Sequence, residues 1–268
     1  MKYSFKPLLA LLLAWSVMPT LSAQSSKTDV NGSWCSIGTS ITWYNNNIND
    51  KNREAGLTRG YQDRVMDRLV FTEFTNVGHN GGVIAESIDR PVKADYYTVE
   101  HGINDWGHST PVGTIDDYIN NTDNGTFAAN YRKLIDRIFE LNPNAKVVLC
   151  TPRKGYNFKG YLPASWDKPK NGIYLSEYAD MVRRIAAYES FPVADFFNEC
   201  GGMRQLRNLS IDDALHPNDD GFQMMANVLV QALEKVITDS RPSVPRRPFI
   251  NRLPKAVKII ESRSISHP

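Results

Sequence analysis

Hydrophobic and polar positions along the chain divide it into two kinds of segment. Five short runs are rich in β-branched or aromatic residues and predict buried strands, at residues 33–38, 73–78, 94–102, 145–151 and 191–197. Most of these runs end in glycine or in polar residues, which are typical of loops.

Apolar residues recur with a helical period between these runs. The pattern predicts helices at 60–71, where Val65, Leu69 and Val70 form the stripe, at 127–141, at 174–190, and from about Asp220 to Ile237. Asp219 or Asp220 can cap the last helix. Strands that alternate with helices favour an α/β fold, with a parallel sheet between two helical layers.

The amino terminus has a different pattern. Lys2 and Lys6 precede a short apolar run, and small residues follow it up to Ala23. This predicts a signal peptide over residues 1–23, and an exported protein that is periplasmic or secreted. A buried N-terminal helix is the less favoured alternative. No run of about 18 apolar residues is present, so we expect no stable membrane insertion of the mature chain.

Charge separates a folded body from a carboxyl-terminal extension. The net charge of the chain is +2, yet residues 24–240 hold 22 Lys and Arg against 28 Asp and Glu. Residues 241–268 are basic and contain five prolines without a sustained period, which predicts a disordered tail. Residues 24–240 show no composition break, so we expect one domain. An acidic body argues against nucleic-acid binding.

The chain has three cysteines, Cys35, Cys150 and Cys200. An oxidising compartment permits one disulfide among them and leaves one thiol over, but the sequence does not say which two pair. None of the three lies in a recognisable nucleophile context.

Polar residues suited to acyl transfer follow three of the predicted strands and precede the last helix. Ser40 follows the first strand, Gly81 lies after the second and Asn104 after the third, while Asp213 and His216 precede the final helix. The carboxyl ends of parallel strands converge on one crevice, so these residues can meet.

Each residue type has a chemical task in this arrangement. A serine hydroxyl needs a base, and histidine, whose unperturbed pKa lies near neutrality, can remove its proton. A carboxylate three residues earlier can fix the tautomer of the imidazole. Backbone N–H groups and an amide side chain can stabilise the oxyanion that forms on an attacked ester.

The four segments "GTSIT", "NVGHNGG", "GIND" and "DALHPN" resemble, in order, the four blocks of the SGNH/GDSL hydrolase superfamily. The resemblance covers about residues 30–240 and implies a flavodoxin-like, three-layer α/β/α fold and hydrolysis of O-acyl esters. It implies a triad of Ser40, His216 and Asp213, and an oxyanion hole of the Ser40 and Gly81 N–H groups with Asn104. Thr39 departs from the pattern, because the GDS spelling has Asp there.

Two of these assignments have alternatives. Gly78 or Gly82 can replace Gly81 as the backbone donor in the loosely matching second block. Asp212 is a rival for Asp213, although the spacing of the family favours the latter.

Four aromatic residues near these blocks are candidates for the wall of a sugar-binding groove, namely Trp43, Tyr44, Trp106 and Trp166. Ordinary packing is an equally good explanation, since aromatic side chains bury a large area wherever they lie.

A metal site is a further alternative in the third block. His101, Asp105 and His108 do not match a strong metal signature. We therefore expect no metal and no other cofactor.

The sequence thus predicts a serine esterase that acts on short O-acyl esters, above all O-acetyl groups on carbohydrate. The expected partner is an acylated small molecule or glycan, and the oligomeric state stays open. A lipolytic esterase or thioesterase of the same fold is one alternative. A non-catalytic glycan-binding module is the other.

Overall fold

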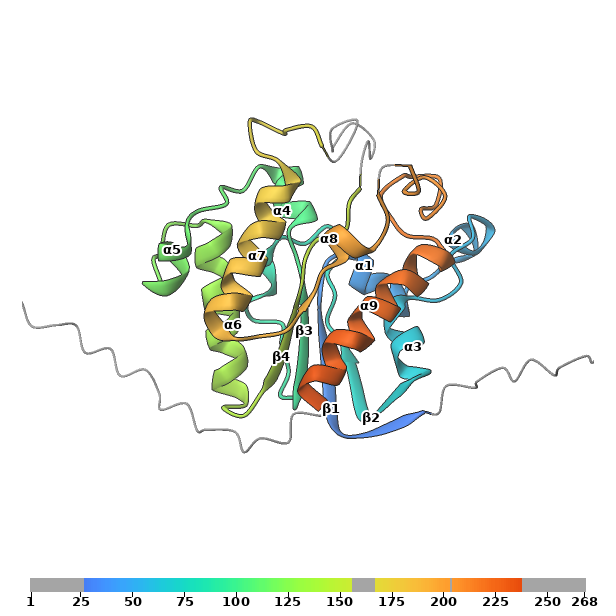
Figure 1. The fold of residues 1–268 in the computed structure, drawn as a ribbon, viewed down its shortest axis with the longest axis horizontal. Helices are drawn as coiled ribbons and strands as arrows, with labels where there is room; N and C mark the ends of the chain where they lie inside the picture. The colour runs from blue at the N-terminus through green and yellow to red at the C-terminus, as the bar shows by residue number, and fades with distance from the viewer. Residues whose placement is uncertain (1–26, 156–166, 203, 238–268) are drawn as a thin grey trace, which may run out of the picture.

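The computed structural model describes residues 27–155, 167–202 and 204–237, which form a single domain around one five-stranded sheet. The strand order is β2-β1-β3-β4-β5 and every pairing is parallel (Figure 1). The strands are β1 (Thr28–Gly38), β2 (Leu69–Asn76), β3 (Tyr96–Glu100), β4 (Lys146–Cys150) and β5 (Val193–Ala194). The predicted fold class is confirmed, whereas the signal peptide and the basic tail lie outside the described residues.

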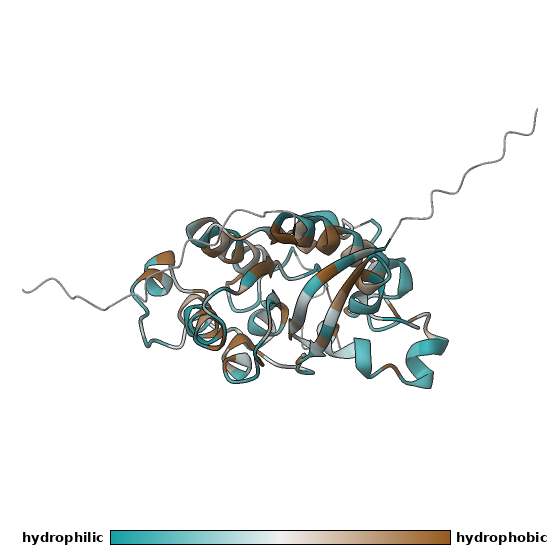
Figure 2. Ribbon diagram, turned by 90° about the horizontal axis from the view of Figure 1, so that it is seen from below, coloured by the Kyte–Doolittle hydropathy of each residue, from teal (hydrophilic) through white to brown (hydrophobic). Residues whose placement is uncertain are grey.

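Helices cover both faces of this sheet. Successive strand residues point to opposite faces, so Cys35 and Tyr97 belong to one apolar cluster and Trp34 and Tyr96 to the other. The first cluster includes residues of α4 (Ile103–His108), α5 (Ile115–Ile119), α6 (Phe127–Leu141) and α7 (Leu175–Glu189). The second includes residues of α3 (Tyr61–Met66), α8 (Phe196–Glu199) and α9 (Asp219–Ile237). Hydrophobic residues accordingly mark the strands and parts of the flanking helices, beside hydrophilic ones (Figure 2).

The shorter elements lie mostly in the connections after the strands. They are α1 (Ser40–Trp43), η1 (Tyr44–Asn46), α2 (Asp50–Glu54) and η2 (Ile84–Ser87). Helices α1 and α4 lie beyond the carboxyl ends of β1 and β3 (Figure 1). None of the helices in the described ranges is long and apolar enough to cross a membrane.

The prediction of a helix over residues 60–71 is wrong at its end. Helix α3 stops at Met66, and Leu69 and Val70 belong to β2. Val65 and Leu69 are four residues apart, which imitates a helical stripe. From Leu69 to Thr72 burial alternates from residue to residue, and the chain pairs with β1, where Thr28 aligns with Leu69. Pairing along the sheet edge therefore overrides the local period, and it extends β1 back from residue 33 to Thr28.

All three cysteines are buried free thiols in the structure, so no disulfide forms among them. Burial raises the pKa of the Cys35 thiol to about 11 and that of the Cys200 thiol to about 12. Both are therefore neutral and poor nucleophiles at neutral pH.

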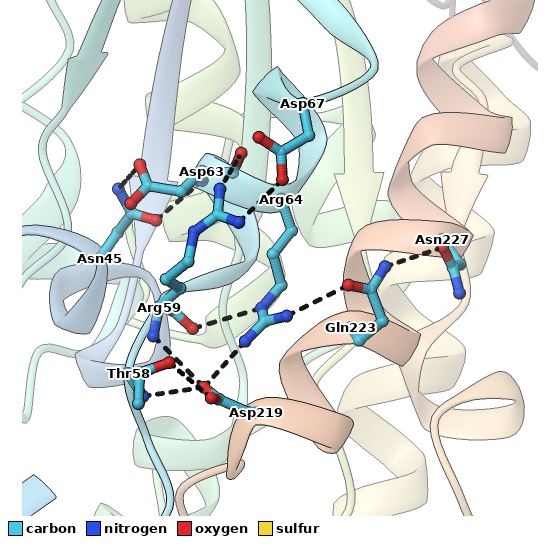
Figure 3. A network of polar contacts seen from close by, with 9 residues as sticks. All are labelled: Asn45, Thr58, Arg59, Asp63, Arg64, Asp67, Asp219, Gln223 and Asn227. Atoms are coloured by element: carbon cyan, nitrogen blue, oxygen red, sulfur yellow. Dashed lines mark hydrogen bonds and ion pairs between the residues drawn. The ribbon is translucent and has the colours of Figure 1, made fainter. Parts of the chain in front are cut away.

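The start of α9 is tied to the loop before α3 by a network around Asp219 (Figure 3). The Asp219 carboxylate accepts hydrogen bonds from the Thr58 N–H at 2.8 Å and the Thr58 hydroxyl at 2.5 Å, and it forms an ion pair of 2.8 Å with Arg64. Because His216 lies three residues before Asp219, this network also fixes the chain that leads into the predicted site.

We expect Asp219→Asn to lower the free energy of unfolding by about 1 kcal/mol at pH 7, since charge-assisted hydrogen bonds are lost and water screens this partly exposed pair. Burial raises the pKa of Asp219, but the bonds from Thr58 and the Arg59 N–H and the charge of Arg64 outweigh it and hold the pKa below 3.8. The stabilisation is thus present above pH 3.8 and is lost as the pH falls through the lowered value.

Urea unfolding of the wild type and of Asp219→Asn at pH 7 and at pH 3 measures this effect. The neighbouring exposed Asp220, changed to Asn, is the matched control and should leave stability within about 0.5 kcal/mol of the wild type. A difference between wild type and Asp219→Asn that is the same at both pH values would contradict the explanation.

Candidate active site

Ser40 lies in the first turn after strand β1. Strand β1 ends at Gly38, and α1 begins at Ser40, which is 4% exposed. Thr39 caps the helix, because its hydroxyl accepts a hydrogen bond from the Ile41 N–H at 3.3 Å. Its carbonyl oxygen accepts one from the Trp43 N–H at 2.9 Å. Both neighbouring peptides of Ser40 are therefore held in place.

The loop before α9 carries Asp213 and His216. One oxygen of Asp213, Oδ1, accepts hydrogen bonds from the backbone N–H groups of Leu215 at 3.0 Å and His216 at 2.8 Å. Ala214, which lies between Asp213 and Leu215, adopts a left-handed φ of 60°, which costs about 1–2 kcal/mol for a residue with a Cβ. The carboxylate thus holds a strained turn, a feature that is frequent at functional sites.

The three side chains form one hydrogen-bonded series. Ser40 Oγ lies 2.8 Å from His216 Nε2, and His216 Nδ1 lies 2.5 Å from Asp213 Oδ2. Burial raises the pKa of the Asp213 carboxyl, but hydrogen bonds from His216 and its charge outweigh that effect and keep the pKa below its usual value. Asp213, rather than the exposed Asp212, is therefore the partner of His216.

Arg153 holds the same loop from the side of β4. Its guanidinium is 1% exposed and donates hydrogen bonds to the carbonyl oxygens of Leu209 at 2.9 Å and Leu215 at 3.3 Å, and to the Ser210 hydroxyl at 3.2 Å. Sequence reasoning missed this residue. A charged residue three positions after a buried strand was the available signal, but nothing local indicates which loop it contacts.

The loop after β2 contains three glycines, and their N–H groups differ in what they contact. The Gly78 N–H donates to Asn76 Oδ1 at 2.9 Å, and the Gly82 N–H donates to the His79 carbonyl oxygen at 3.0 Å. Gly81 lines the pocket beside Ser40 and has a φ of +78°, which a residue without a Cβ adopts easily. Of the three, Gly81 therefore fits the predicted backbone donor best.

Asn104 is the second residue of α4, the helix that follows β3. Its side-chain Nδ2 donates to the Gly82 carbonyl oxygen at 3.0 Å, so the amide is oriented by the loop after β2. The turn before it needs Gly102, where φ is +128° and a Cβ would lie 3.0 Å from Pro152. The next residue, Asp105, is buried and accepts a hydrogen bond from the Ile84 N–H at 3.2 Å, so it ties α4 to the segment after β2.

These residues surround a pocket of about 240 Å³. Its lining consists of Ser40, Asn80, Gly81, Asn104, His108, Leu215 and His216. Residues from four distant stretches of sequence therefore meet at the carboxyl edge of the sheet, as the sequence predicts.

The four candidate aromatic residues differ in their surroundings. The Tyr44 ring packs edge-on against the His216 ring at 4.8 Å between centroids, and the Trp43 ring lies 5.5 Å from Tyr44. Both are partly exposed. Trp106 is fully buried in the core, where its indole N–H donates to the Ile173 carbonyl oxygen at 2.9 Å, so it packs the fold and does not line the pocket. Trp166 lies outside the described residues.

The two histidines considered for a metal site lie in different environments. His101 is fully buried, and burial, with repulsion from His79 and Arg90, lowers its pKa to about 3, so its ring is neutral. His108 instead lines the pocket. Across the parts of the chain that the structure describes, no three His, Cys, Asp or Glu residues are grouped so that they could hold a metal ion.

Comparison with known proteins adds the family. The model of the GDSL-like lipase/acylhydrolase family matches residues 36–224, which include Ser40, Gly81, Asn104, Asp213 and His216. No curated protein matches the chain.

Solved structures share the fold. A protein described as a possible lipase from Chitinophaga pinensis DSM 2588 is 28% identical over 76% of this chain and 98% of its own, with a TM-score of 0.63. A protein from Lactobacillus plantarum is 21% identical over 78% of this chain and 98% of its own, with a TM-score of 0.63. A lipase/acylhydrolase from Enterococcus faecalis is 14% identical over 78% of this chain and 99% of its own, with a TM-score of 0.50.

Proposed function

The chain belongs to the GDSL-like lipase/acylhydrolase family and is an ester-hydrolysing serine hydrolase, and from this premise we propose that it removes short O-acyl groups, chiefly O-acetyl, from carbohydrate. One observation carries the proposal. The hydrogen-bonded series Ser40–His216–Asp213 opens into a pocket of only about 240 Å³.

The proposed reaction begins with the attack of Ser40 Oγ on the ester carbonyl carbon. His216 accepts the hydroxyl proton through Nε2, from which Ser40 Oγ is 2.8 Å away, and returns it to the departing alcohol. Asp213 keeps the proton of the neutral ring on Nδ1 and stabilises the imidazolium that forms. A water molecule, activated in turn by His216, then releases the acid from Ser40.

The charge on the attacked carbonyl oxygen needs donors that already point toward it. Ser40 is the first residue of α1, where backbone N–H groups have no acceptor within the helix. We assign this N–H, the Gly81 N–H and the Asn104 side-chain amide as the donors. The bond from Asn104 to Gly82 sets the orientation of the amide before substrate arrives.

The size and lining of the pocket support a short acyl group. Pockets for drug-sized ligands measure about 300–1,000 Å³, so a space of about 240 Å³ suits a small group. Among the described residues that line it, only Leu215 carries an aliphatic side chain. Long acyl chains thus gain little apolar contact there.

Aromatic rings support a carbohydrate as the alcohol side of the ester. Trp43 and Tyr44 stay partly exposed beside His216, where the alcohol must leave. Aromatic faces suit stacking against sugar rings. The predicted signal peptide over residues 1–23 implies that the protein is exported. The proposed substrate is therefore an acetylated glycan or a smaller acylated sugar outside the cytoplasm.

Acetate release from a panel of acetylated polysaccharides, compared between the wild type and Ser40→Ala, tests the proposed function. We expect release by the wild type from at least one glycan and none above background by the variant. Turnover of simple chromogenic acetates without release from any glycan would overturn the carbohydrate part alone.

A series of nitrophenyl esters tests the acyl group. We expect kcat/KM to be highest for acetate and to fall by about tenfold or more at eight carbons, because the longer chain does not fit. A channel for long chains would instead add about 0.8 kcal/mol of binding for each buried methylene. A preference for eight or more carbons would therefore favour a lipolytic esterase or thioesterase.

A further inference from the structure

A buried glutamate lies directly beneath the turn that carries Ser40. Glu100 is the last residue of β3, is aligned with Gly38 of β1, and is 0% exposed. One of its oxygens, Oε2, accepts three hydrogen bonds, from the Thr39 N–H at 3.2 Å, the Thr39 hydroxyl at 2.8 Å and the Thr42 hydroxyl at 3.3 Å. The three donors come from residues on both sides of Ser40.

The contacts continue away from Ser40 into the core. The Thr42 hydroxyl lies 2.8 Å from the Tyr61 hydroxyl, and the Thr42 carbonyl oxygen accepts a hydrogen bond from Gln62 at 2.9 Å. Gly38 leaves room for this arrangement, because a Cβ there would lie 2.1 Å from the Thr42 hydroxyl. The turn that carries Ser40 is thus held by hydrogen bonds to polar side chains on the side of the sheet. Glu100 accepts three of these bonds, more than any other residue does.

We propose that Glu100 is a positioning residue for Ser40, whose ionised carboxylate holds the Thr39–Thr42 turn so that the hydroxyl and N–H of Ser40 keep their catalytic orientation. This inference rests on the proposed function. Hydrogen bonds to a charged acceptor are about twice as strong as those to a neutral one, so the ionised form holds the turn more firmly than the protonated form. Position 39 is a threonine in this chain, where the GDS spelling of the family has an aspartate. Glu100 instead supplies a carboxylate to this turn from β3.

The surroundings of Glu100 make its ionisation sensitive to pH. Burial raises its pKa to about 7, although the bonds from Thr39 and Thr42 oppose that shift. Its second oxygen, Oε1, has no hydrogen-bond partner among the described residues. Among the described residues, the charge of Glu100 raises the pKa of titratable groups on four elements, namely Tyr61, Asp105, Tyr131 and Cys150.

The rate–pH profile of the wild type is the first test. We expect kcat for a chromogenic acetate ester to fall with two inflections on its acidic side, and we assign the second of them to Glu100. A single inflection would overturn the proposal. Burial also raises the pKa of Asp105 to about 7, so variants must assign the second inflection.

Glu100→Gln keeps the shape of the side chain and removes its charge. We expect kcat to fall about tenfold above pH 8 with KM changed less than about twofold, and the second inflection to disappear. Glu73→Gln, at an exposed position of β2, is the matched control and should keep the wild-type profile. If the second inflection persists in Glu100→Gln and disappears in Asp105→Asn, the proposal is wrong.

Stability separates positioning from a general structural role. Because the folded protein raises the pKa of Glu100, this group favours folding below its ordinary value near 4.5, and that contribution is lost as the pH rises through about 7. Glu100→Gln should therefore have a thermal midpoint at pH 8 that is equal to or above the wild type, although its kcat is lower. A lower midpoint with unchanged kcat would contradict the proposal.

Thr42→Val provides a second variant that leaves Glu100 in place. It removes one donor to the carboxylate, so we expect the second inflection to move to higher pH. An unmoved inflection would assign the titration to another group and overturn the proposal. Ser40→Ala keeps the two hypotheses apart, because retained activity there contradicts the proposed function, whereas a failure confined to Glu100 and Thr42 variants contradicts only this inference.

Discussion

Ser40→Ala is expected to lower kcat/KM for a chromogenic acetate ester by at least about 10⁴-fold. The change removes the oxygen that attacks the substrate, which lies 2.8 Å from the Nε2 atom of the base His216. What remains is the effect of binding and of the oxyanion donors on a water molecule, which is small by comparison.

We expect the same change to have little effect on the stability of the fold. Ser40 loses one hydrogen bond at the edge of a pocket that solvent can enter, so we expect the free energy of unfolding to change by less than about 1 kcal/mol. In a chain of this size that corresponds to a shift of the thermal midpoint of at most about 4 °C. Activity and thermal unfolding, measured on one preparation, therefore separate loss of chemistry from loss of structure.

Ser87→Ala is the matched control for this experiment. Ser87 is also buried, but its hydroxyl has no hydrogen-bond partner among the described residues and it lies away from the pocket lining. The variant should keep wild-type activity. Retention of more than about one percent of kcat/KM by Ser40→Ala would instead show that another group performs the attack.

The sequence predicts the sheet and the site well where short motifs contain their own geometry. The run "KVVLC" is buried on both faces of the sheet, so its composition alone marks β4. The segment "DALH" places a carboxylate three residues before a histidine, and the turn at Ala214 closes that distance locally. In both cases the interactions that decide the outcome lie within a few residues of one another.

Long-range contacts explain the errors. The boundary between α3 and β2 depends on the pairing of Leu69 with Thr28, which no local period can report. The burial of Trp106 depends on the chain around Ile173, far along the sequence, and Arg153 is recognisable only once its contacts with Leu209 and Leu215 are seen. Glu100 was missed for the same reason, since its partners precede it by about sixty residues.

The second large effect is expected for Asp213→Asn, which should lower kcat by about 10³- to 10⁴-fold. The asparagine can still accept the backbone N–H groups of Leu215 and His216 through its oxygen, so the strained turn at Ala214 keeps its support. Its amide then directs N–H groups toward His216 Nδ1, where a carboxylate oxygen lies in the wild type at 2.5 Å. The imidazole consequently carries its proton on Nε2, the nitrogen that must accept the proton of Ser40.

Asp212→Asn is the matched control for the triad assignment. Asp212 is an exposed neighbour of Asp213, and its substitution changes the net charge by the same amount. We expect it to keep kcat within about twofold of the wild type. The ring tautomer provides an independent readout, since ¹⁵N chemical shifts of His216 distinguish a proton on Nδ1 from one on Nε2. A large loss in Asp212→Asn with little change in Asp213→Asn would exchange the two roles. Equal, small effects in both would mean that His216 activates Ser40 without a carboxylate.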